Sequence, residues 1–228
     1  MRFEKIICEA YGSFTISANG PMIIRSTVNT KLTPENADAI FIEGAVDEKN
    51  NAFLIPGSSI KGVVRHYLTN GYNDDVIENL FGKVKKGALK SKISFSDAYA
   101  DMSTIKTSMR YQTKIDAISQ GASKGSLNSI LAVTQGDFKC DYRIRNFSAD
   151  ELELFIRAIK AFDSGEICIG GRISRGYGMV RIKDFNIVIS NGYNENLEAK
   201  IILKSQNVTE LEKAIPEIKA KFMKAEVN

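Results

Sequence analysis

Hydrophobic and polar positions repeat with two different periods along the chain, and these periods predict a mixture of strands and helices. Alternating or continuous apolar runs, which are typical of strands, occupy positions 2–18, 93–99, 138–145 and 179–189. We expect the first run to form one strand, or two strands broken at Gly12. Apolar residues return every three or four positions, as in amphipathic helices, at 58–68, 74–81 and 148–162.

Local signals mark where two of these helices begin. Pro56-Gly57 stops the preceding apolar run, and Ser58 or Ser59 is placed to cap the first helix. The sequence Ser-Ala-Asp-Glu at positions 148–151 is a capping box that starts the last helix. Both helices therefore have a chemical reason to begin where the apolar period begins.

The order of the elements indicates the fold class. With insertions set aside, the chain runs strand, helix, strand, strand, helix, strand, which is the split βαβ pattern of ferredoxin-like folds. The open antiparallel sheet of this fold is also the scaffold of the RNA-recognition motif. We therefore predict an α+β, ferredoxin-like fold. The apolar runs 39–42 and 53–55 are expected to add the two arms of a hairpin.

Several stretches do not fit the core pattern and are interpreted as insertions. We expect a single domain over residues 1–194, with insertions at about 19–55 and 70–91. Residues 103–136 are poor in strong hydrophobes and rich in Ser, Gln, Gly and Lys, so they predict a long excursion with the form of an irregular hairpin. Residues 195–228 are expected to form a peripheral extension, with a helix from about 209 that packs back on the body.

Composition narrows the classes of function. The chain has 228 residues and a net charge of +4, which supports nucleic-acid binding only weakly. Its three cysteines lack metal-ligand spacing and predict buried thiols in a reducing cytoplasm. The chain has only one histidine, His66, which excludes a metal site built from several histidines and a nuclease that uses two histidines. Because the sequence shows no signal peptide and no membrane-spanning stretch, we expect a cytoplasmic protein that does not bind membranes.

Two turns that combine glycines with cations carry the strongest functional signal. The first, at positions 56–65, leads into a helix N-terminus, which favours anion binding. The second, at positions 170–178, reads Gly-Gly-Arg-Ile-Ser-Arg-Gly-Tyr-Gly; a tight turn feeding a strand is its alternative interpretation. The cations of the two turns are Lys61, Arg65, Arg172 and Arg175. Two such turns predict a ligand with several phosphates.

Three segments, in this order, resemble the repeat-associated mysterious proteins, the RAMP superfamily of CRISPR effector complexes. Ile-Pro-Gly-Ser-Ser-Ile-Lys-Gly-Val-Val-Arg at 55–65 resembles the family's first signature, and 170–178 resembles its C-terminal glycine-rich loop. Leu-Phe-Gly at 80–82, followed by 93–98, resembles its middle region. Within the superfamily, the chain is most similar to the repeating backbone subunits of type III complexes.

The resemblance implies a shape and a set of partners. Such subunits resemble a hand, with a ferredoxin-like palm, inserted fingers and a thumb hairpin that interrupts the guide–target duplex. The excursion at 103–136 fits the thumb, and its Ile115-Asp116 resembles a pair often found there. The implied partners are CRISPR RNA, complementary target RNA, copies of the same chain and other effector subunits. Base pairing to the guide would then supply the sequence specificity.

The residues expected to contact RNA come from both turns and from the excursion. They are Ser58, Ser59, Lys61, Arg65, Arg110, Lys114, Gly171, Arg172, Ser174, Arg175 and Gly176. Backbone N–H groups of the two turns are expected to assist the cations at the guide phosphates. Tyr111 is suited either to stacking on a base or to packing within the protein. Ser58 and Lys61 also match a serine-acylase pattern, whose partner motifs are missing.

The resemblance also implies a cleavage residue. In several such subunits a loop aspartate, upstream of an apolar strand, cleaves target RNA with a divalent metal. Asp38 best fills this position and would act with Mg²⁺ or Mn²⁺, whereas Asp47 is the competing match in a turn-forming run. The alternative for Asp38 is a solvated loop residue without a catalytic role.

Four hypotheses about function follow. The first is a guide-binding backbone subunit that cleaves target RNA through Asp38, and the second is the same subunit without catalysis. The third, a processing endonuclease for CRISPR RNA, would want a general base, and His66 lies behind the first glycine turn. The fourth is a ferredoxin-like domain for another ligand, which the two cationic turns disfavour.

Overall fold

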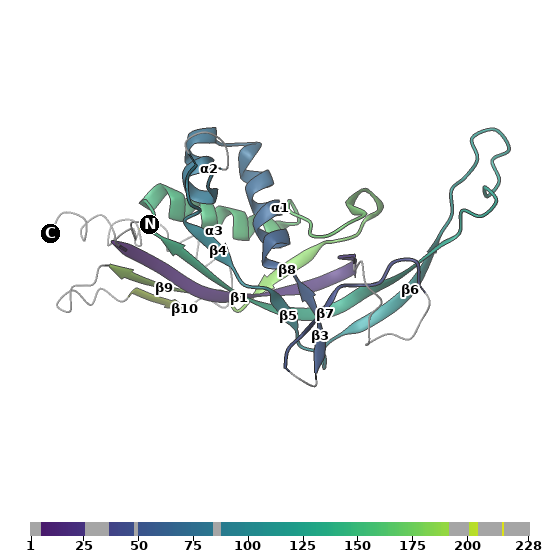
Figure 1. Ribbon diagram of the computed structural model, residues 1–228, viewed down its shortest axis with the longest axis horizontal. Coiled ribbons are helices and arrows are strands. Elements are labelled where there is room, and N and C mark those ends of the chain that lie inside the picture. Colours follow the sequence, from purple (N-terminus) through teal and green to yellow (C-terminus); the bar gives the residue numbers. More distant parts are fainter. Residues whose placement is uncertain are drawn as a thin grey trace.

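The computed structural model is built on one antiparallel sheet, with helices on one face and a long hairpin that projects from one end (Figure 1). It describes residues 6–25, 37–47, 50–83 and 88–191, together with the strand 201–204 and Pro216. The helix expected from about residue 209 falls outside the described residues, apart from Pro216. No helix in the described part is long and apolar enough to cross a membrane.

The centre of the sheet has the predicted ferredoxin-like topology. Its strands are β1 (Cys8–Met22), β4 (Ile93–Phe95), β7 (Asn128–Arg145) and β8 (Val180–Lys183). They lie in the order β8-β1-β7-β4, and each neighbouring pair is antiparallel. Because β7 separates β1 from β4, and β1 separates β7 from β8, both crossovers are of the split type. The predicted fold class is confirmed.

Shorter strands widen the sheet on both sides. One side continues through β5 (Ala98–Ala100), β3 (Asn51–Ile55) and β2 (Glu43–Ala45). The other side continues through β9 (Asn186–Asn191) and β10 (Ile201–Lys204). Finally, β6 (Lys106–Gln112) pairs with the first part of β7 and makes the projecting hairpin.

The boundaries of several strands differ from those expected. The first strand is not broken at Gly12, where a Cβ atom would lie 2.1 Å from the Asn186 carbonyl oxygen, so close strand packing explains the glycine. The run 93–99 divides into β4 and β5. The run 179–189 divides into β8 and β9 at Asp184, whose φ of 51° ends the extended backbone.

The hairpin expected from 39–42 and 53–55 is also shifted. Its first strand is β2, where Glu43 pairs with Phe53, while Ala39 makes an isolated parallel bridge to Ile130 of β7. The segment 39–42 therefore ties the insertion to the long strand. This docking brings the loop that carries Asp38 against the base of the projecting hairpin.

Within residues 6–191, the described α-helices are α1 (Gly57–Thr69), α2 (Asp74–Phe81) and α3 (Ala149–Ser164). The capping box of α3 is confirmed, with Ser148 and Glu151 each bonded to the other's backbone N–H. The capping expected for α1 is wrong. Pro56 is the N-cap and no side chain of the turn caps the helix; instead the Gly57 N–H donates to Asp97 Oδ1 at 2.8 Å.

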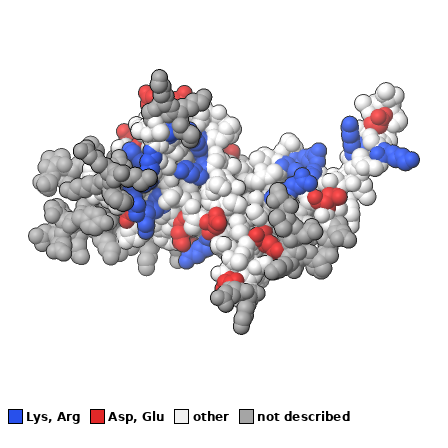
Figure 2. All heavy atoms as spheres, in the orientation of Figure 1, with Lys and Arg blue, Asp and Glu red and all other residues white. Residues whose placement is uncertain are grey.

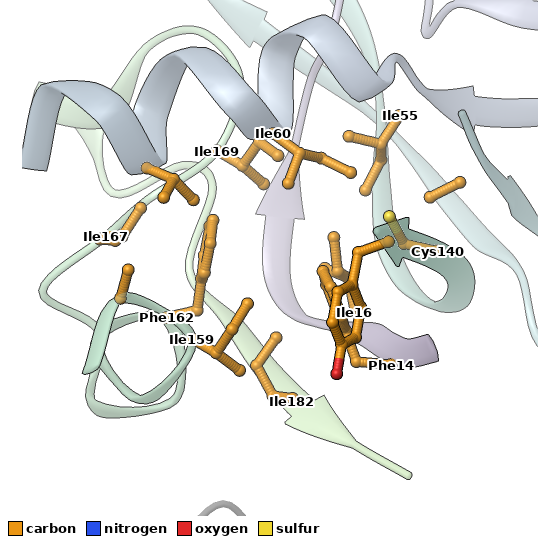
Figure 3. Packing of buried hydrophobic residues seen from close by; sticks show 14 of the residues in the cluster. Phe14, Ile16, Ile55, Ile60, Cys140, Ile159, Phe162, Ile167, Ile169 and Ile182 are labelled. Atoms are coloured by element: carbon orange, nitrogen blue, oxygen red, sulfur yellow. The ribbon is translucent and has the colours of Figure 1, made fainter. Parts of the chain in front are cut away.

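Buried side chains from the sheet and from both crossover helices share one core (Figure 3). Phe14 and Ile16 of β1 meet Ile60 of α1 and Phe162 of α3, and all four are fully buried. Burying a side chain of this size contributes about 1.5–3 kcal/mol. The core therefore fixes the N-terminal turn of α1 and the loop between α3 and β8 relative to the sheet.

The projecting hairpin is a regular ladder with an irregular tip. Gln112 pairs with Asn128 at the last rung, and the tip spans residues 113–127. Within the tip, Asp116 accepts hydrogen bonds from the N–H groups of Ile118 and Ser119, which closes a local turn. The excursion predicted for 103–136 thus has the form of a hairpin, although the strand expected from 138 already begins at Asn128.

Candidate nucleic-acid interface

The two cation-bearing turns, far apart in the sequence, line one cavity. Its volume is about 520 Å³, and it lies where the first turns of α1 meet the loop between α3 and β8 and the chain that follows β1. The lining residues are Ile23, Ile24, Arg25, Ala39, Ser59, Gly62, Val63, Gly170, Gly171 and Arg172. Apolar side chains form the walls, and two arginines and a serine supply polar groups.

The glycines of the second turn allow it to lie close to the end of β1. Gly170 has a φ of 94°, and a Cβ atom there would lie 2.4 Å from the Ile23 carbonyl oxygen. The Gly171 N–H donates to that same oxygen at 2.9 Å, and the Gly176 N–H donates to Ile173 O. Both amides are thus engaged within the protein, so the backbone donors expected at Gly171 and Gly176 are not free for RNA.

The two arginines of this turn converge on the base of the hairpin. Arg172 and Arg175 both donate to Oε1 of Gln112, and Arg172 also donates to Oδ1 of Asn128 at 3.0 Å. Figure 2 shows Lys and Arg side chains gathered over this loop. Two guanidinium groups held around one neutral acceptor make a favourable position for a phosphate. Ser174 is exposed beside them.

The first turn is less available than the sequence indicated. The Asp97 carboxylate already takes the Gly57 N–H, so the helix N-terminus expected to bind an anion is partly filled by the protein's own carboxylate. Nζ of Lys61 donates to Ser91 Oγ at 2.6 Å and to Ile93 O at 3.2 Å. Burial, and then the charge of Arg65, lower the pKa of Lys61. Lys61 therefore joins α1 to the start of β4.

The other residues expected from α1 keep positions at the surface. Ser58 and Arg65 are exposed, and Ser59 is half-buried in the wall of the cavity. On the projecting hairpin, Arg110 and Lys114 are exposed and Tyr111 is 67% exposed. Figure 2 shows a second group of cations near the hairpin tip, separate from the group over the glycine loop.

Asp38 lies beside the cavity and is held by one residue of β7. Its Oδ2 accepts hydrogen bonds from Ser129 N at 2.6 Å and from Ser129 Oγ at 2.8 Å. Arg25 donates to the Asp38 carbonyl oxygen at 3.2 Å. The hydrogen bond from the Ser129 backbone N–H lowers the pKa of the Asp38 carboxyl most, and the hydrogen bond from the Ser129 hydroxyl lowers it further. The Asp38 side chain is exposed, and its carboxyl is ionised at neutral pH because its pKa is lowered.

The competing aspartate has a local structural role. Both carboxylate oxygens of Asp47 accept hydrogen bonds from Asn50, one from the backbone N–H and one from the side-chain amide, each at 2.8 Å. These contacts close the turn between β2 and β3. Asp38, whose neighbour Ala39 lines the cavity, is the better-placed carboxylate.

Comparison with known proteins identifies the family. Residues 15–181 match the model of the RAMP superfamily, which is well over half of the chain. The chain belongs to the RAMP superfamily. The resemblance drawn from the three sequence segments is thereby confirmed.

Two individual RAMP-related proteins are similar to the chain. The CRISPR system Cms endoribonuclease Csm3 of Streptococcus thermophilus is 27% identical over 182 residues, which cover 67% of this chain and 82% of the relative. A chain in the crystal structure of a Csm3–Csm4 subcomplex of the type III-A CRISPR-Cas interference complex has the same fold. It aligns with a TM-score of 0.59 and 18% identity, over 94% of this chain and 98% of that one.

The carboxylate of Asp38 suits a metal ion that RNA phosphates also bind. Among the described residues, it does not belong to a site in which protein side chains supply all the ligands. In the part of the chain that the structure describes, no three His, Cys, Asp or Glu side chains converge to hold a metal ion. Asp38 is exposed, and its Ser129 contacts use only Oδ2. Mg²⁺ is usually bound by one or two carboxylates together with phosphates and water, so a single ionised carboxylate suits it.

The structure adds functional candidates that the sequence did not single out. Gln112 and Asn128 hold the arginines, Ser129 holds Asp38, and Arg25 lines the cavity while bonded to the Asp38 backbone. None of the four belongs to a motif identified in the sequence: Arg25 lies within the insertion at about 19–55, and the other three lie within the excursion at 103–136. The register of the hairpin, which places Gln112 opposite Asn128, is a signal that would have brought those two together.

Proposed function

We propose that this RAMP protein is a CRISPR RNA-binding backbone subunit of a type III interference complex, which positions guide and target RNA and cleaves the target through Asp38. The cavity shared by the two cation-bearing turns, with the Asp38 loop at its edge, is the observation that carries the proposal. Similarity to a Csm3 endoribonuclease supports it.

The guide would follow the cavity and the cations around it. Arg172 and Arg175 would exchange their contact with Gln112 for a guide phosphate, because a charged acceptor forms the stronger hydrogen bond. Arg65, Ser58 and Ser59 of α1 and Ser174 of the glycine loop flank this path. Lys61 contributes by holding α1 on the sheet. Arg110 and Lys114 would contact the duplex from the hairpin, which acts as the thumb.

Cleavage would use the nucleophile that RNA carries itself. When one nucleotide is held with the reacting atoms in line, the 2′-OH would lose its proton to water and attack the adjacent phosphorus. The bond to the 5′ oxygen of the next nucleotide breaks, that oxygen takes a proton from water, and a 2′,3′-cyclic phosphate remains. The in-line positioning supplies much of the rate. Asp38 is fixed by Ser129 at the edge of the cavity, and its exposed carboxylate would hold Mg²⁺ or Mn²⁺. The metal, when bound, would stabilise negative charge on the phosphate. Arg25, bonded to the Asp38 backbone, has further N–H donors for the same phosphate.

Copies of the chain and other effector subunits are the proposed partners. One protein of known structure that shares this fold is described as part of a Csm3–Csm4 subcomplex. A repeating arrangement along the guide would bring one Asp38 to the target at each repeat. Cuts at regular intervals are the signature of such an arrangement.

Cleavage of target RNA by the assembled complex tests the proposal. Asp38→Ala should abolish the regularly spaced cuts, because it removes the carboxylate that Ser129 holds beside the cavity, while guide binding is retained. Asp47→Ala is the matched control and should cleave at the wild-type rate, since Asp47 closes a turn. The wild-type cuts should require Mg²⁺ or Mn²⁺ and disappear in EDTA.

Two outcomes would change the proposal. Cuts that persist unchanged with Asp38→Ala would remove Asp38 as the cleavage residue. If the complex binds guide and target but neither the wild-type chain nor Asp38→Ala gives cuts, the chain would be a backbone subunit without catalytic activity.

A further inference from the structure

The Asp38 loop is attached to the hairpin base mainly through Ser129. Besides the two hydrogen bonds to Oδ2, the Asp38 N–H donates to Ser129 Oγ at 3.1 Å. The backbone continues the attachment, since Ala39 N donates to Ser129 O at 3.1 Å and Leu131 N donates to Ala39 O at 2.9 Å. The loop and β7 therefore meet in a short parallel bridge that pairs Ala39 with Ile130, and Ser129 flanks this pair on the side of Asp38.

The contacts of Ser129 select one oxygen of the carboxylate. Its N–H and its O–H both end on Oδ2, which fixes the rotation of the Asp38 side chain and leaves Oδ1 outside the pair. The hydroxyl donates to Oδ2 and accepts from the Asp38 N–H, which is within the capacity of a serine. A carboxylate held in this way keeps one orientation relative to the cavity.

We propose that Ser129 is a positioning residue for target cleavage, which orients the Asp38 carboxylate so that Oδ1 faces the RNA and its metal. This inference rests on the proposed function of Asp38. Small errors in position are costly in such reactions, because a misplacement of about 1 Å can cost roughly 10²-fold in rate.

The neighbouring residue extends the argument to the guide. Asn128, directly before Ser129 on β7, accepts a hydrogen bond from Arg172 at 3.0 Å. Two consecutive residues of one strand thus hold a proposed guide contact and the proposed cleavage carboxylate. The distance between guide phosphate and cleavage site is therefore set by the backbone of β7.

The contacts of Ser129 can be separated by mutation. Ser129→Ala removes the two hydrogen bonds of the hydroxyl. It keeps the backbone ones, in which the N–H at position 129 donates to Asp38 Oδ2 and the carbonyl accepts from Ala39 N. The loop should remain docked while the carboxylate loses its fixed orientation. Ser129→Thr keeps the hydroxyl on a residue suited to a strand. Ser108→Ala, on the same hairpin with only a 3.5 Å contact to Met109 O, is the matched control.

The experiment uses the complex assembled with guide RNA. Ser129→Ala should slow single-turnover cleavage about 10–100-fold and raise the Mn²⁺ concentration that gives half the maximal rate. Guide and target affinities should stay within about twofold of wild type. Ser129→Thr should recover most of the rate, and Ser108→Ala should match wild type. Independently of cleavage, hydrogen–deuterium exchange of the full-length chain should quicken at the peptide that contains the Asp38 N–H.

The outcomes distinguish the positioning role of Ser129 from the proposed role of Asp38 in cleavage. If Asp38→Ala is inactive while Ser129→Ala cleaves at the wild-type rate with the wild-type metal dependence, the positioning role is refuted and the function of Asp38 stands. If Asp38→Ala cleaves normally, both fail. Loss of guide affinity in Ser129→Ala in proportion to the loss of cleavage would make Ser129 structural and overturn the inference.

Discussion

At the scale of single residues, the two arginines proposed to bind the guide are held by contacts within the protein. Arg172 and Arg175 share Oε1 of Gln112, so both guanidinium groups are directed to one place. The sequence did not indicate this shared partner, since Gln112 lies 60 positions from Arg172. The sequence identified the cations from local composition, but long-range contacts decide where each cation points. Lys61 shows the opposite case, because its ammonium group, expected to contact a phosphate, donates hydrogen bonds to Ser91 and Ile93 within the protein.

Neutralising both arginines should weaken guide binding and its dependence on salt. With Arg172→Gln and Arg175→Gln combined, the slope of log affinity against log salt should become shallower by about 1.4, since each phosphate contact to single-stranded RNA contributes about 0.7. Titrations of guide RNA at several salt concentrations measure this slope. Arg157→Gln, on the exposed side of α3, is the control. An unchanged slope in the double variant would argue against a phosphate site in this loop.

At the scale of elements, helix α3 could be predicted from the sequence and the start of helix α1 could not. The capping box of α3 involves two residues three positions apart, so a local pattern is sufficient. The Gly57 N–H at the start of α1 donates to Asp97, 40 positions downstream and beyond the insertion at about 70–91. A local pattern offered Ser58 and Ser59 instead. Elements whose ends depend on tertiary contacts escape sequence reasoning for this physical reason.

Unfolding measurements can distinguish Asp97 from Ser58 as the residue that satisfies the N-terminus of α1. Asp97→Ala should lower the free energy of unfolding by about 1 kcal/mol, because the Gly57 N–H loses its acceptor. Ser58→Ala should change it by less than about 0.5 kcal/mol, since Ser58 is exposed and makes no cap. Urea unfolding of the two variants beside wild type gives both values. A larger loss for Ser58→Ala than for Asp97→Ala would contradict the structure at this helix end.

At the scale of the whole molecule, the order of elements was sufficient to predict the ferredoxin-like sheet. The insertions were harder, because their apolar residues do not follow one period. The segment 39–42 looked like a hairpin arm, yet it bridges to Ile130 of β7. Asp38 itself came from the family resemblance, whereas its place beside the cavity depends on this bridge. The sequence therefore indicated which residues matter, and the docking of the insertion determines how they are grouped.

Removing the hairpin tip tests its proposed role as a thumb. Residues 113–127 can be replaced by Asn-Gly, because Gln112 and Asn128 pair directly and a two-residue turn can close that rung. The variant should unfold at nearly the wild-type urea concentration, since the side chains of Ile118 and Leu127 are 95% and 67% exposed. The complex should bind guide RNA but lose regularly spaced target cuts. Cuts with unchanged spacing, checked on denaturing gels, would show that the tip is dispensable.

Strand β7 runs for 18 residues without interruption, from the core to the last rung of the hairpin. The last pair between β1 and β7 joins Met22 to Val133. At about 3.4 Å per residue, the five residues of β7 before Val133 extend roughly 17 Å past that pair. Over such a length, a tilt of about 5° moves the far end by about 1.5 Å. The hairpin thus acts as a lever that turns about its base in the sheet. In the proposed arrangement of repeated subunits, the stiffness of that base would limit how evenly the subunits are spaced along the RNA.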